Sequence, residues 1–592
     1  MTYRAPVKDM LFAMRELAGI DAIAQLPGFE DAGYETAQAV LEECAKLNEG
    51  VVAPLNVDGD LNPSSFKEGN VLSTPGFKEA FKQFTQGGWQ GLHHPTDFGG
   101  QGLPKLIHAA CQEMVNAANL SFALCPLLTD GAIEALLTAG SEEQKAAYIP
   151  KLIDGTWTGT MNLTEPQAGS DLSMVRSRAE PQPGGSYKIF GTKIFITWGE
   201  HDMAENIIHL VLARLPDAPQ GSKGISLFIV PKFMPNADGS VGARNGIHCN
   251  AIEHKMGIHG NSTSQLILED AVGTLVGEPN KGLMAMFVMM NAARLGVGNQ
   301  SLGLTEVAYQ NAVAYAKDRI QMRSLSGPKA PDKPADPIIV HPDVRKMLLT
   351  ARAFAEGGRA LIAHTVVQLD KALHHPDEDV RKECDDEVAL LTPIIKAFIT
   401  DNGWLATSHC MQVFGGHGYI HESGMEQYVR DARINMIYEG TNTVQSLDLL
   451  GRKILSDNGK KLKAFGQKIA AFVEDEGVRE DMQEFVNPLG DIGDKVTKLT
   501  TEIGMKAFQN PDEVGAAAVD YLRVCGHLVF AYFFARMAKV ALEKKDSGDK
   551  FYQAKLTTAR FYFAKLLPET AGLIRTCRAG LKPLMEMDEA LF

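Results

Sequence analysis

The sequence predicts a mainly α-helical protein that carries one β-rich segment in the middle of its chain. Apolar residues recur at three- and four-residue spacing on both sides of that segment, whereas residues 159–277 show short runs rich in β-branched and aromatic residues. With 592 residues, the chain is also too long for a single hydrophobic core. We therefore expect several structural units, and the changes of pattern along the chain define four.

The first predicted unit, residues 1–158, is helical. Segments such as YETAQAVLEECAKLNEG place apolar residues on one helical face, and Gly/Pro breaks such as HHPTDFGGQGLP interrupt them. The second unit, residues 159–277, contains the runs GTMNLTE, SYKIFGTKIFIT, NIIHLVLARL, KGISLFIVPKF and TSQLILEDA, separated by Gly, Pro and Asn turns. These runs predict a compact all-β unit.

The third predicted unit, residues 278–455, returns to helical periodicity. It begins with the long segment KGLMAMFVMMNAARLGVGNQSLGLTEVAYQNAVAYAKDR. Residues 326–337, SGPKAPDKPADP, are too rich in proline for regular structure and predict an exposed loop between two helices. The fourth unit, residues 456–592, is helical again, and its strongly apolar segment VDYLRVCGHLVFAYFFARMAKVALEKK must be buried against neighbours.

Charge and cysteine usage exclude several classes of protein. The net charge of -14 disfavours nucleic acid or an anionic membrane as the main partner, and residues 456–592 hold twenty Lys and Arg against twenty Asp and Glu. The eight cysteines stand singly with no CxxC pair, which favours a reducing compartment. Pro6, Lys8 and Asp9 stand where a signal peptide needs an apolar run, and we read no stretch of membrane-spanning length. We therefore expect a cytoplasmic protein with no membrane span.

Several common cofactor signatures are absent from the sequence. It contains no GxxxxGK[ST] phosphate loop, no GxGxxG fingerprint between a strand and a helix, and no HExxH metal pair. An ATP-dependent or nicotinamide-dependent enzyme of ordinary design is therefore not expected, and neither is a metal site.

Two segments of the β-rich unit carry candidate binding groups. In MNLTEPQAGSD, residues 161–171, Thr164 supplies a hydroxyl and the Gly169-Ser170 turn leaves backbone N–H groups free for a ring edge or a phosphate. In KIFITWG, residues 193–199, strand alternation sends Phe195 and Thr197 to the same face, where they suit a planar ring. A Thr-capped turn and a core strand would explain either segment on its own.

Two segments of the third unit also carry candidate chemistry. In MQVFGGHGYIHE, residues 411–422, paired glycines let a ligand approach the backbone closely, although a helix C-cap explains them equally well. In RDARINMIYEGTNTVQ, residues 430–445, Glu439 stands between an apolar run and a Gly-Thr turn. A carboxylate there would be partly desolvated, which raises its pKa and makes it a useful base. The alternative is a glutamate that merely favours a helix N-terminus.

Taken together, TEPQAGSD, FITWG, FGGHGY and IYEGT occur in the order and at the separations typical of acyl-CoA dehydrogenases, and the chain resembles this family over most of residues 35–455. The resemblance implies an N-terminal helical domain, a middle β-barrel-like domain and a C-terminal helical bundle, with FAD extended between the β-domain and the bundle. The segment after residue 455 resembles the extra helical domain of large bacterial members. That group includes 3-(methylthio)propanoyl-CoA dehydrogenases and fatty acyl-CoA dehydrogenases.

The resemblance also implies the roles of individual residues. Glu439 matches the catalytic base, and Ala293 stands where some members carry the base instead, so Glu439 has no competitor. The residues implied to contact FAD are Met161, Leu163, Thr164, Gly169, Ser170, Phe195, Ile196, Thr197, Arg319, Gln412, Val413, Phe414, Gly415, Gly416, Thr441 and Thr443. Those implied to contact the substrate are Ser170, Asn291, Arg294 and Gly440.

Some of these implied contacts require an oligomer. Arg319 and residues 412–416 would reach the FAD of a neighbouring subunit. The extension after residue 455 would replace the second dimer of the smaller tetrameric members, which leaves a homodimer. His417 is interpreted as a structural residue, because a Gly-flanked histidine at a turn needs no chemical role.

The implied activity is FAD-dependent removal of two hydrogens from an acyl-CoA thioester to give the trans-2-enoyl-CoA, as in fatty acid β-oxidation, with electrons passed to electron-transfer flavoprotein. The substrate stays open between 3-(methylthio)propanoyl-CoA and a short, medium or long fatty acyl-CoA. Two other functions also stay open. One is an acyl-CoA oxidase that uses O2, and the other is a flavin-containing DNA-protective protein, against which the neutral charge balance of residues 456–592 argues.

Overall fold

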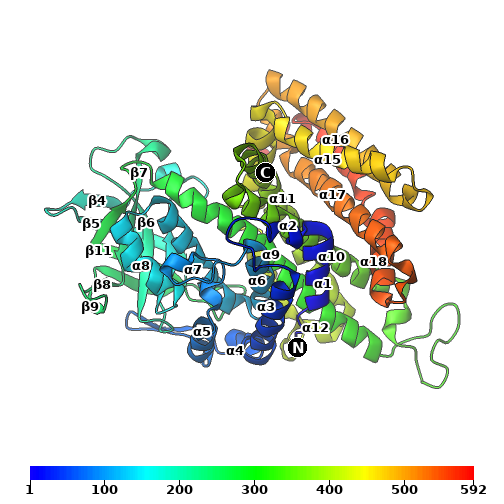
Figure 1. The fold of residues 1–592 in the computed structure, drawn as a ribbon, viewed down its shortest axis with the longest axis horizontal. Coiled ribbons are helices and arrows are strands. Elements are labelled where there is room, and N and C mark those ends of the chain that lie inside the picture. The colour runs from blue at the N-terminus through cyan, green and yellow to red at the C-terminus, as the bar shows by residue number, and fades with distance from the viewer. The chain divides into compact units, whose positions relative to one another are not determined.

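A computed structural model describes all residues 1–592 of the chain (Figure 1). Contacts within the chain divide it into two units. One, which we call the barrel unit, comprises residues 43–104 and 114–296, and the other, the helical unit, comprises residues 1–42, 105–113 and 297–592. The predicted mainly α fold with a middle β-domain is confirmed. The four predicted segments describe order along the chain, and their boundaries stay predictions.

The sheet of the barrel unit closes on itself. Strand β11 pairs with β5 and β7, β5 pairs with β4, and β6 pairs with both β4 and β7. Strand β3 extends the sheet parallel to β6, and β10 pairs antiparallel with β11. The seven strands are β3 (Trp157–Asn162), β4 (Arg178–Pro181), β5 (Tyr187–Thr197), β6 (Asn206–Arg214), β7 (Ile225–Pro231), β10 (Ile247–Ile252) and β11 (Thr263–Val276). The predicted β-barrel-like domain is therefore confirmed.

Alternation along the strands divides the apolar residues of the barrel unit between two cores. In β6, Leu210 and Leu212 face a core that they share with the helices α7 (Leu120–Ala139) and α8 (Glu142–Ile153), whereas Val211 faces the second core. Helices α4 (Leu55–Leu61) and α5 (Phe77–Gln86) and two short ribbons complete the unit. The ribbons are β1 (Ser65–Lys67) with β2 (Asn70–Leu72) and β8 (Phe233–Pro235) with β9 (Val241–Arg244).

Long helices form the core of the helical unit. Helix α9 (Gly282–Asp318) enters it from the barrel unit, and α10 (Pro342–His374) and α11 (Glu378–Val413) pack together after a three-residue connection. The remaining helices of this region are α1 (Val7–Phe12), α2 (Ile20–Ile23), α3 (Tyr34–Leu47), α6 (Lys105–Ala118), α12 (Gly416–Tyr419), α13 (Met425–Ile434) and α14 (Asn442–Leu447).

The C-terminal extension packs on this bundle through one central helix, α17 (Asp512–Glu543). Helix α17 contacts α10, α11 and α14, as well as α16, α18 and α19 of the extension itself. Gly526 allows the closest approach, because a Cβ there would lie 2.3 Å from Cγ of Phe398 on α11. The predicted burial of this apolar segment is confirmed. The other long helices of the extension are α15 (Lys460–Glu476), α16 (Gln483–Gln509), α18 (Lys550–Phe561) and α19 (Glu569–Ala579).

The expectation that no stretch reaches membrane-spanning length is wrong. Helices α7 and α17 are both long and apolar enough to cross a bilayer. Within the fold, 83% of the most apolar window of α7 and 67% of that of α17 are buried. A buried core helix of a soluble protein can have the same length and apolar composition, so these two properties alone are weak evidence of a membrane span.

The predicted loop between α9 and α10 has no regular structure over residues 326–337, as expected, but it is anchored at its end. The buried Asp336 accepts hydrogen bonds from the backbone N–H groups of Ser324 (2.9 Å), Lys329 (2.8 Å) and Ala330 (2.7 Å). Burial alone would raise the pKa of Asp336, but these donors hold it below its usual value. A loop of polar composition is thus folded around one carboxylate.

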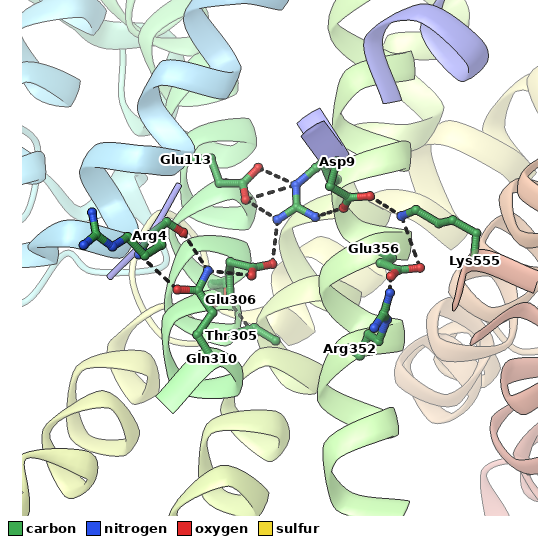
Figure 2. A network of polar contacts seen from close by, with 11 residues as sticks. Arg4, Asp9, Glu113, Thr305, Glu306, Gln310, Arg352, Glu356 and Lys555 are labelled. Atoms are coloured by element: carbon green, nitrogen blue, oxygen red, sulfur yellow. Dashed lines mark hydrogen bonds and ion pairs between the residues drawn. The ribbon is translucent and has the colours of Figure 1, made fainter. Parts of the chain in front are cut away.

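The buried Arg359 joins four helices of the helical unit, and Figure 2 labels its three acidic partners. Arg359 of α10 pairs with Glu113 of α6 at 2.5 Å, with Glu306 of α9 at 2.8 Å, and with Asp9 of α1. A guanidinium with several donors in a fixed plane suits such a junction, because each carboxylate can be bonded without moving the others.

The same network continues to the C-terminal extension. Asp9 also pairs with Lys555 of α18, which lies 3.2 Å from Glu356, and Arg352 pairs with Glu356 at 2.7 Å. Four carboxylates therefore face only three cations in a buried region, and one acid is best left protonated. Burial, which Arg359 only partly offsets, raises the pKa of Glu113 to about 7.

This raised pKa predicts a loss of stability as the pH rises. A carboxyl group whose pKa is near 7 when folded and near 4.5 when unfolded favours folding below the unfolded value, and this contribution is lost as the pH rises through 7. Glu113→Gln should therefore gain stability relative to the native protein as the pH rises from 4 to 8.5, by on the order of 3 kcal/mol, with most of the gain between the unfolded and folded pKa values. Thermal unfolding midpoints of both proteins across this range would measure it. A constant difference between the two midpoints would contradict the assignment.

Candidate active site

Glu439 lies on a strained turn between α13 and α14 of the helical unit. Glu439 and Gly440 are both left-handed, with φ of 57° and 83°. Such a conformation costs a residue with a side chain about 1–2 kcal/mol. Glu439 is partly exposed, and Asn442, whose N–H donates to the Met436 carbonyl at 3.2 Å, closes the turn. A non-glycine residue persists in this conformation only where its surroundings fix it, which suggests a function for its side chain.

Side chains before the turn fix it to α9. Tyr438 donates its hydroxyl hydrogen to Gln300 and lies 3.0 Å from the Asn435 amide oxygen, and Asn435 donates to the Ser301 hydroxyl at 2.9 Å. Burial and the nearby charge of Glu439 raise the pKa of Tyr438 well above its usual value, so its hydroxyl stays neutral.

Side chains after the turn fix it to α11. The Asn442 oxygen accepts from Lys396 at 2.9 Å, and its amide donates to Asp401 at 2.6 Å and to Thr400 at 3.0 Å. Thr441 caps α14, since its hydroxyl accepts from the Val444 N–H at 3.4 Å. The next implied FAD contact, Thr443, is exposed on the first turn of that helix. Thr441 therefore has a structural role, and its implied contact with FAD stays a prediction.

Arg319 and residues 412–416, which were implied to reach FAD, come together in one cavity of about 520 Å³ in the helical unit. Arg319 follows the last turn of α9, and its guanidinium makes no hydrogen bond or ion pair within the chain. The Phe414 ring stacks on Tyr315 at 4.1 Å between ring centres. A Cβ at Gly415 or Gly416 would meet no heavy atom within 4 Å, so the backbone there is open to a ligand. The cavity is lined by Tyr315, Arg319, Gln321, Ile338, Gln412, Val413, Phe414, Gly415, Gly416, His417 and Ile420.

Four of these lining residues, Tyr315, Gln321, Ile338 and Ile420, were missed from the sequence. Tyr315 stands four residues before Arg319, one helical turn away on the same face of α9, and this spacing could have identified it. His417 approaches the Tyr315 hydroxyl at 3.3 Å, and the structural role given to it stays a prediction. Nothing in the local sequence marks Ile338, which reaches the cavity because its N–H binds the Arg319 carbonyl at 2.8 Å.

In the barrel unit, a buried ion pair supports the MNLTEPQAGSD segment. Lys193 of β5 donates to Glu165 at 2.8 Å and to the Leu163 carbonyl at 3.1 Å. Glu165 also accepts from the Ser177 hydroxyl at 2.6 Å. Burial would raise the pKa of Glu165, but Lys193 and the hydrogen-bond donors lower it to about 2. Met161 and Leu163 are buried, Thr164 is partly exposed, and Gly169 and Ser170 are exposed.

The KIFITWG segment contains a β-bulge that the sequence did not reveal. Pairing with β11 shifts between Lys193 and Ile196, and Phe195 is left-handed with φ of 61°. The bulge interrupts the regular alternation before Ile196. Phe195 is 59% exposed and Thr197 is partly exposed, on either side of the buried Ile196, and the shared face of Phe195 and Thr197 stays a prediction.

The implied substrate contacts on α9 lie one turn apart in the barrel unit. Arg294 donates to the Asn291 amide oxygen at 3.3 Å, Asn291 is exposed, and Ala293 is buried. The predicted site residues thus form three groups in the barrel unit. In the helical unit they form two more, one at the turn of Glu439 and Gly440, which we call the base turn, and one at the cavity. Their roles stay predictions.

One cluster outside these groups has the composition of a metal site. His93, His94 and Glu134 place their candidate ligand atoms within 4.8 Å of one another. His93 lies 3.3 Å from Glu134, and His94 lies 2.9 Å from Asp130, so each imidazole already has a carboxylate partner. The sequence contained no spacing that would have shown this cluster.

The models of four family domains match the chain. These are "Acyl-CoA dehydrogenase, N-terminal domain" over residues 35–156, "middle domain" over 160–271, "C-terminal domain" over 280–455 and "Acetyl-CoA dehydrogenase C-terminal like" over 465–588. The chain belongs to the acyl-CoA dehydrogenase family, and it is an oxidoreductase. The predicted family, with its added C-terminal helical domain, is confirmed.

Several relatives match nearly the whole chain, among them the following two. The 3-methylmercaptopropionyl-CoA dehydrogenase of Ruegeria pomeroyi is 45% identical over 576 residues, which cover 97% of each chain. The broad-specificity linear acyl-CoA dehydrogenase FadE5 of Mycobacterium tuberculosis is 34% identical and covers 100% of both chains.

Solved structures agree on the fold. ACDH-11 of Caenorhabditis elegans in complex with C11-CoA has a TM-score of 0.78 at 20% identity, covering 95% of this chain and 91% of that chain. An acyl-CoA dehydrogenase complexed with FAD from Bacillus anthracis has a TM-score of 0.75 at 22% identity, covering 98% and 93%. The predicted fold class is therefore confirmed.

Proposed function

We propose that this protein catalyses FAD-dependent α,β-dehydrogenation of an acyl-CoA thioester, with Glu439 as the base. The observation that carries the proposal is the turn at residues 439–440, which holds a partly exposed carboxylate in a strained conformation and is fixed on both sides. A glutamate that only favoured a helix N-terminus would need neither the strain nor the surrounding hydrogen bonds.

The chain's own contribution to the reaction is proton transfer and orientation. The α-hydrogen of a thioester is weakly acidic, so its removal needs a base whose pKa has been raised and whose position is fixed. Glu439 takes this proton as the α,β double bond forms. The negative charge that develops on the thioester oxygen needs hydrogen-bond donors, and the backbone N–H of Glu439 is the donor implied by resemblance.

The residues of the helical-unit cavity fit FAD. Arg319 offers an unpaired guanidinium suited to a pyrophosphate, and Gly415 and Gly416 leave room for a ligand to approach the backbone beside the stacked Tyr315 and Phe414 rings. In the barrel unit, residues 163–164 and 195–197 are proposed as flavin contacts. FAD, when bound, supplies the acceptor for the hydride that leaves the β-carbon.

Arg319→Ala should lower FAD content. The variant loses the cation proposed to bind the pyrophosphate, and a hydrogen-bonded charge pair is worth about 1.5–3 kcal/mol, or roughly tenfold to a hundredfold in affinity. Absorbance of the purified protein near the flavin maximum, relative to protein concentration, would measure it. Lys317→Ala, two residues earlier and exposed on α9, is the matched control. Equal flavin content in both variants would refute the role of Arg319.

We propose 3-(methylthio)propanoyl-CoA as the substrate, because 45% identity over 97% of both chains is the strongest of the similarities described. A linear fatty acyl-CoA is the second candidate, supported by the 34% identity to a broad-specificity relative. Electron-transfer flavoprotein as acceptor, a homodimer and a cytoplasmic location complete the proposal.

A panel of acyl-CoA thioesters would test the activity and the substrate together. The purified flavoprotein is mixed without oxygen with methylthiopropanoyl-, butanoyl-, octanoyl- and palmitoyl-CoA, and flavin bleaching is followed. We expect the methylthio substrate to give the largest rate constant relative to its dissociation constant. Mixing the reduced protein with air then separates the two acceptors, since rapid reoxidation with peroxide formation would identify an oxidase.

A further inference from the structure

Gln445, to which the sequence motifs assigned no role, holds the middle of the base turn. Gln445 lies on α14, is fully buried, and donates its side-chain amide hydrogens to the carbonyl oxygens of Glu439 at 3.3 Å and Gly440 at 3.2 Å. The amide carries two N–H hydrogens, so each carbonyl can accept one of them.

The orientation of this amide is fixed by the carbonyls it binds. Turning the amide over would set its oxygen against the oxygens of Glu439 and Gly440, which repel it. In the observed orientation the Gln445 oxygen is buried without a hydrogen-bond partner. A buried acceptor left unsatisfied weakens local stability, so the donor side of the amide accounts for the residue at this position.

The two bonds act directly on the conformation of the base. Glu439 and Gly440 are both left-handed, and their two carbonyl oxygens accept hydrogen bonds from the same Gln445 side chain. If Glu439 relaxed to the ordinary negative φ, its peptide groups would rotate and its side chain would leave Cα in a different direction. Tyr438 and Asn442 hold the ends of the turn, and Gln445 bonds the carbonyls of the two strained residues themselves.

We propose that Gln445 is a positioning residue for the catalytic base. Its amide keeps the Glu439-Gly440 peptide groups in the conformation that presents the Glu439 carboxylate to the substrate α-hydrogen. This inference rests on the proposed function and adds to it the device that sets the direction of the base.

Gln445→Met removes both hydrogen bonds while keeping side-chain length. We expect FAD content and acyl-CoA dissociation constant close to native, and a rate constant for anaerobic flavin bleaching at saturating acyl-CoA lowered by about tenfold to a hundredfold. Gln368→Met is the matched control, because Gln368 is also a buried glutamine of the helical unit and its amide oxygen accepts only from Cys384. A bleaching rate in Gln445→Met equal to that of Gln368→Met would overturn the proposal.

Gln445→Glu gives a second test that does not depend on Gln445→Met folding. A protonated carboxyl can still donate to one carbonyl, whereas an ionised one repels both, and burial raises the pKa of the new carboxyl. The ratio of variant to native bleaching rates should therefore fall as the pH rises through that pKa. A ratio that does not change with pH would indicate a purely structural role and overturn the proposal.

Measuring Glu439→Gln beside these variants separates the two ideas. If Glu439→Gln bleaches like the native protein, Glu439 is not the base and the proposed function fails first. If Glu439→Gln is inactive while Gln445→Met behaves as its control, only the positioning role is wrong.

Discussion

Glu439→Gln protein is expected to purify with bound FAD and to lose its reduction by acyl-CoA. Glutamine keeps the size of the side chain but cannot accept the α-proton, and loss of a positioned general base typically lowers a rate by about 10²- to 10⁴-fold. The contacts that hold the turn use the backbone of Glu439 and the side chains of its neighbours, so the fold should survive. Stopped-flow absorbance without oxygen measures the rate.

Glu439→Asp is the control for this experiment. Aspartate keeps the base but shortens the side chain, so its rate should fall between those of the native protein and Glu439→Gln. Substantial flavin bleaching by Glu439→Gln would show that another residue removes the proton, and Ala293 cannot supply it.

Lys193→Met should cost the barrel unit about 3–5 kcal/mol of stability, because it leaves the Glu165 carboxylate buried without its cation. The side chain of Lys193 has no exposed surface and that of Glu165 is 4% exposed. Three of the four tryptophans, Trp89, Trp157 and Trp198, belong to this unit, so urea unfolding followed by fluorescence would report on it. Lys193 also holds the Leu163 carbonyl, so flavin content should fall as well.

Two further variants test whether the buried charge causes this effect. Lys188 lies on β5 like Lys193, and Lys188→Met breaks its exposed pair with Asp270 of β11, which should cost less than about 1 kcal/mol. Glu165→Gln combined with Lys193→Met should recover much of the loss, since no unpaired charge remains. The pKa of Glu165 is lowered to about 2, so the native pair stabilises above pH 4.5 and is lost as the pH falls toward 2. Equal losses for Lys188→Met and Lys193→Met would contradict the role of burial.

The strands that the sequence predicted are those whose alternation is long and apolar. Runs such as NIIHLVLARL coincide with β6, whereas β4 and β10 were missed because RAEP and IHCNAI are short and partly polar. The bulge at Phe195 was invisible for the opposite reason. Its neighbours are all good strand residues, and only pairing with β11 reveals the extra residue.

The surroundings of the charged residues at the site could not be predicted from sequence patterns. Lys and Glu are usually exposed, so the sequence alone places Lys193 and Glu165 at the surface. Their burial follows only from the strand pairing that brings them together. Glu439 could be singled out by its flanking residues. Its left-handed conformation and the hydrogen bond that its carbonyl accepts from Gln445 of α14 became known only from the structure. Arg319 and residues 412–416 are about 90 positions apart, and only the family resemblance placed them in one site before the structure did.

The position of α17 has a consequence for how the chain could have evolved. Its apolar surface covers α10, α11 and α14, so a chain ending at residue 455 would expose that face of the bundle to water. A chain without this segment would have to shield that face by other means, such as contact with a second subunit. A longer polypeptide that provides its own cover has no need to recruit another subunit there, which is why we propose an assembly of two copies rather than four.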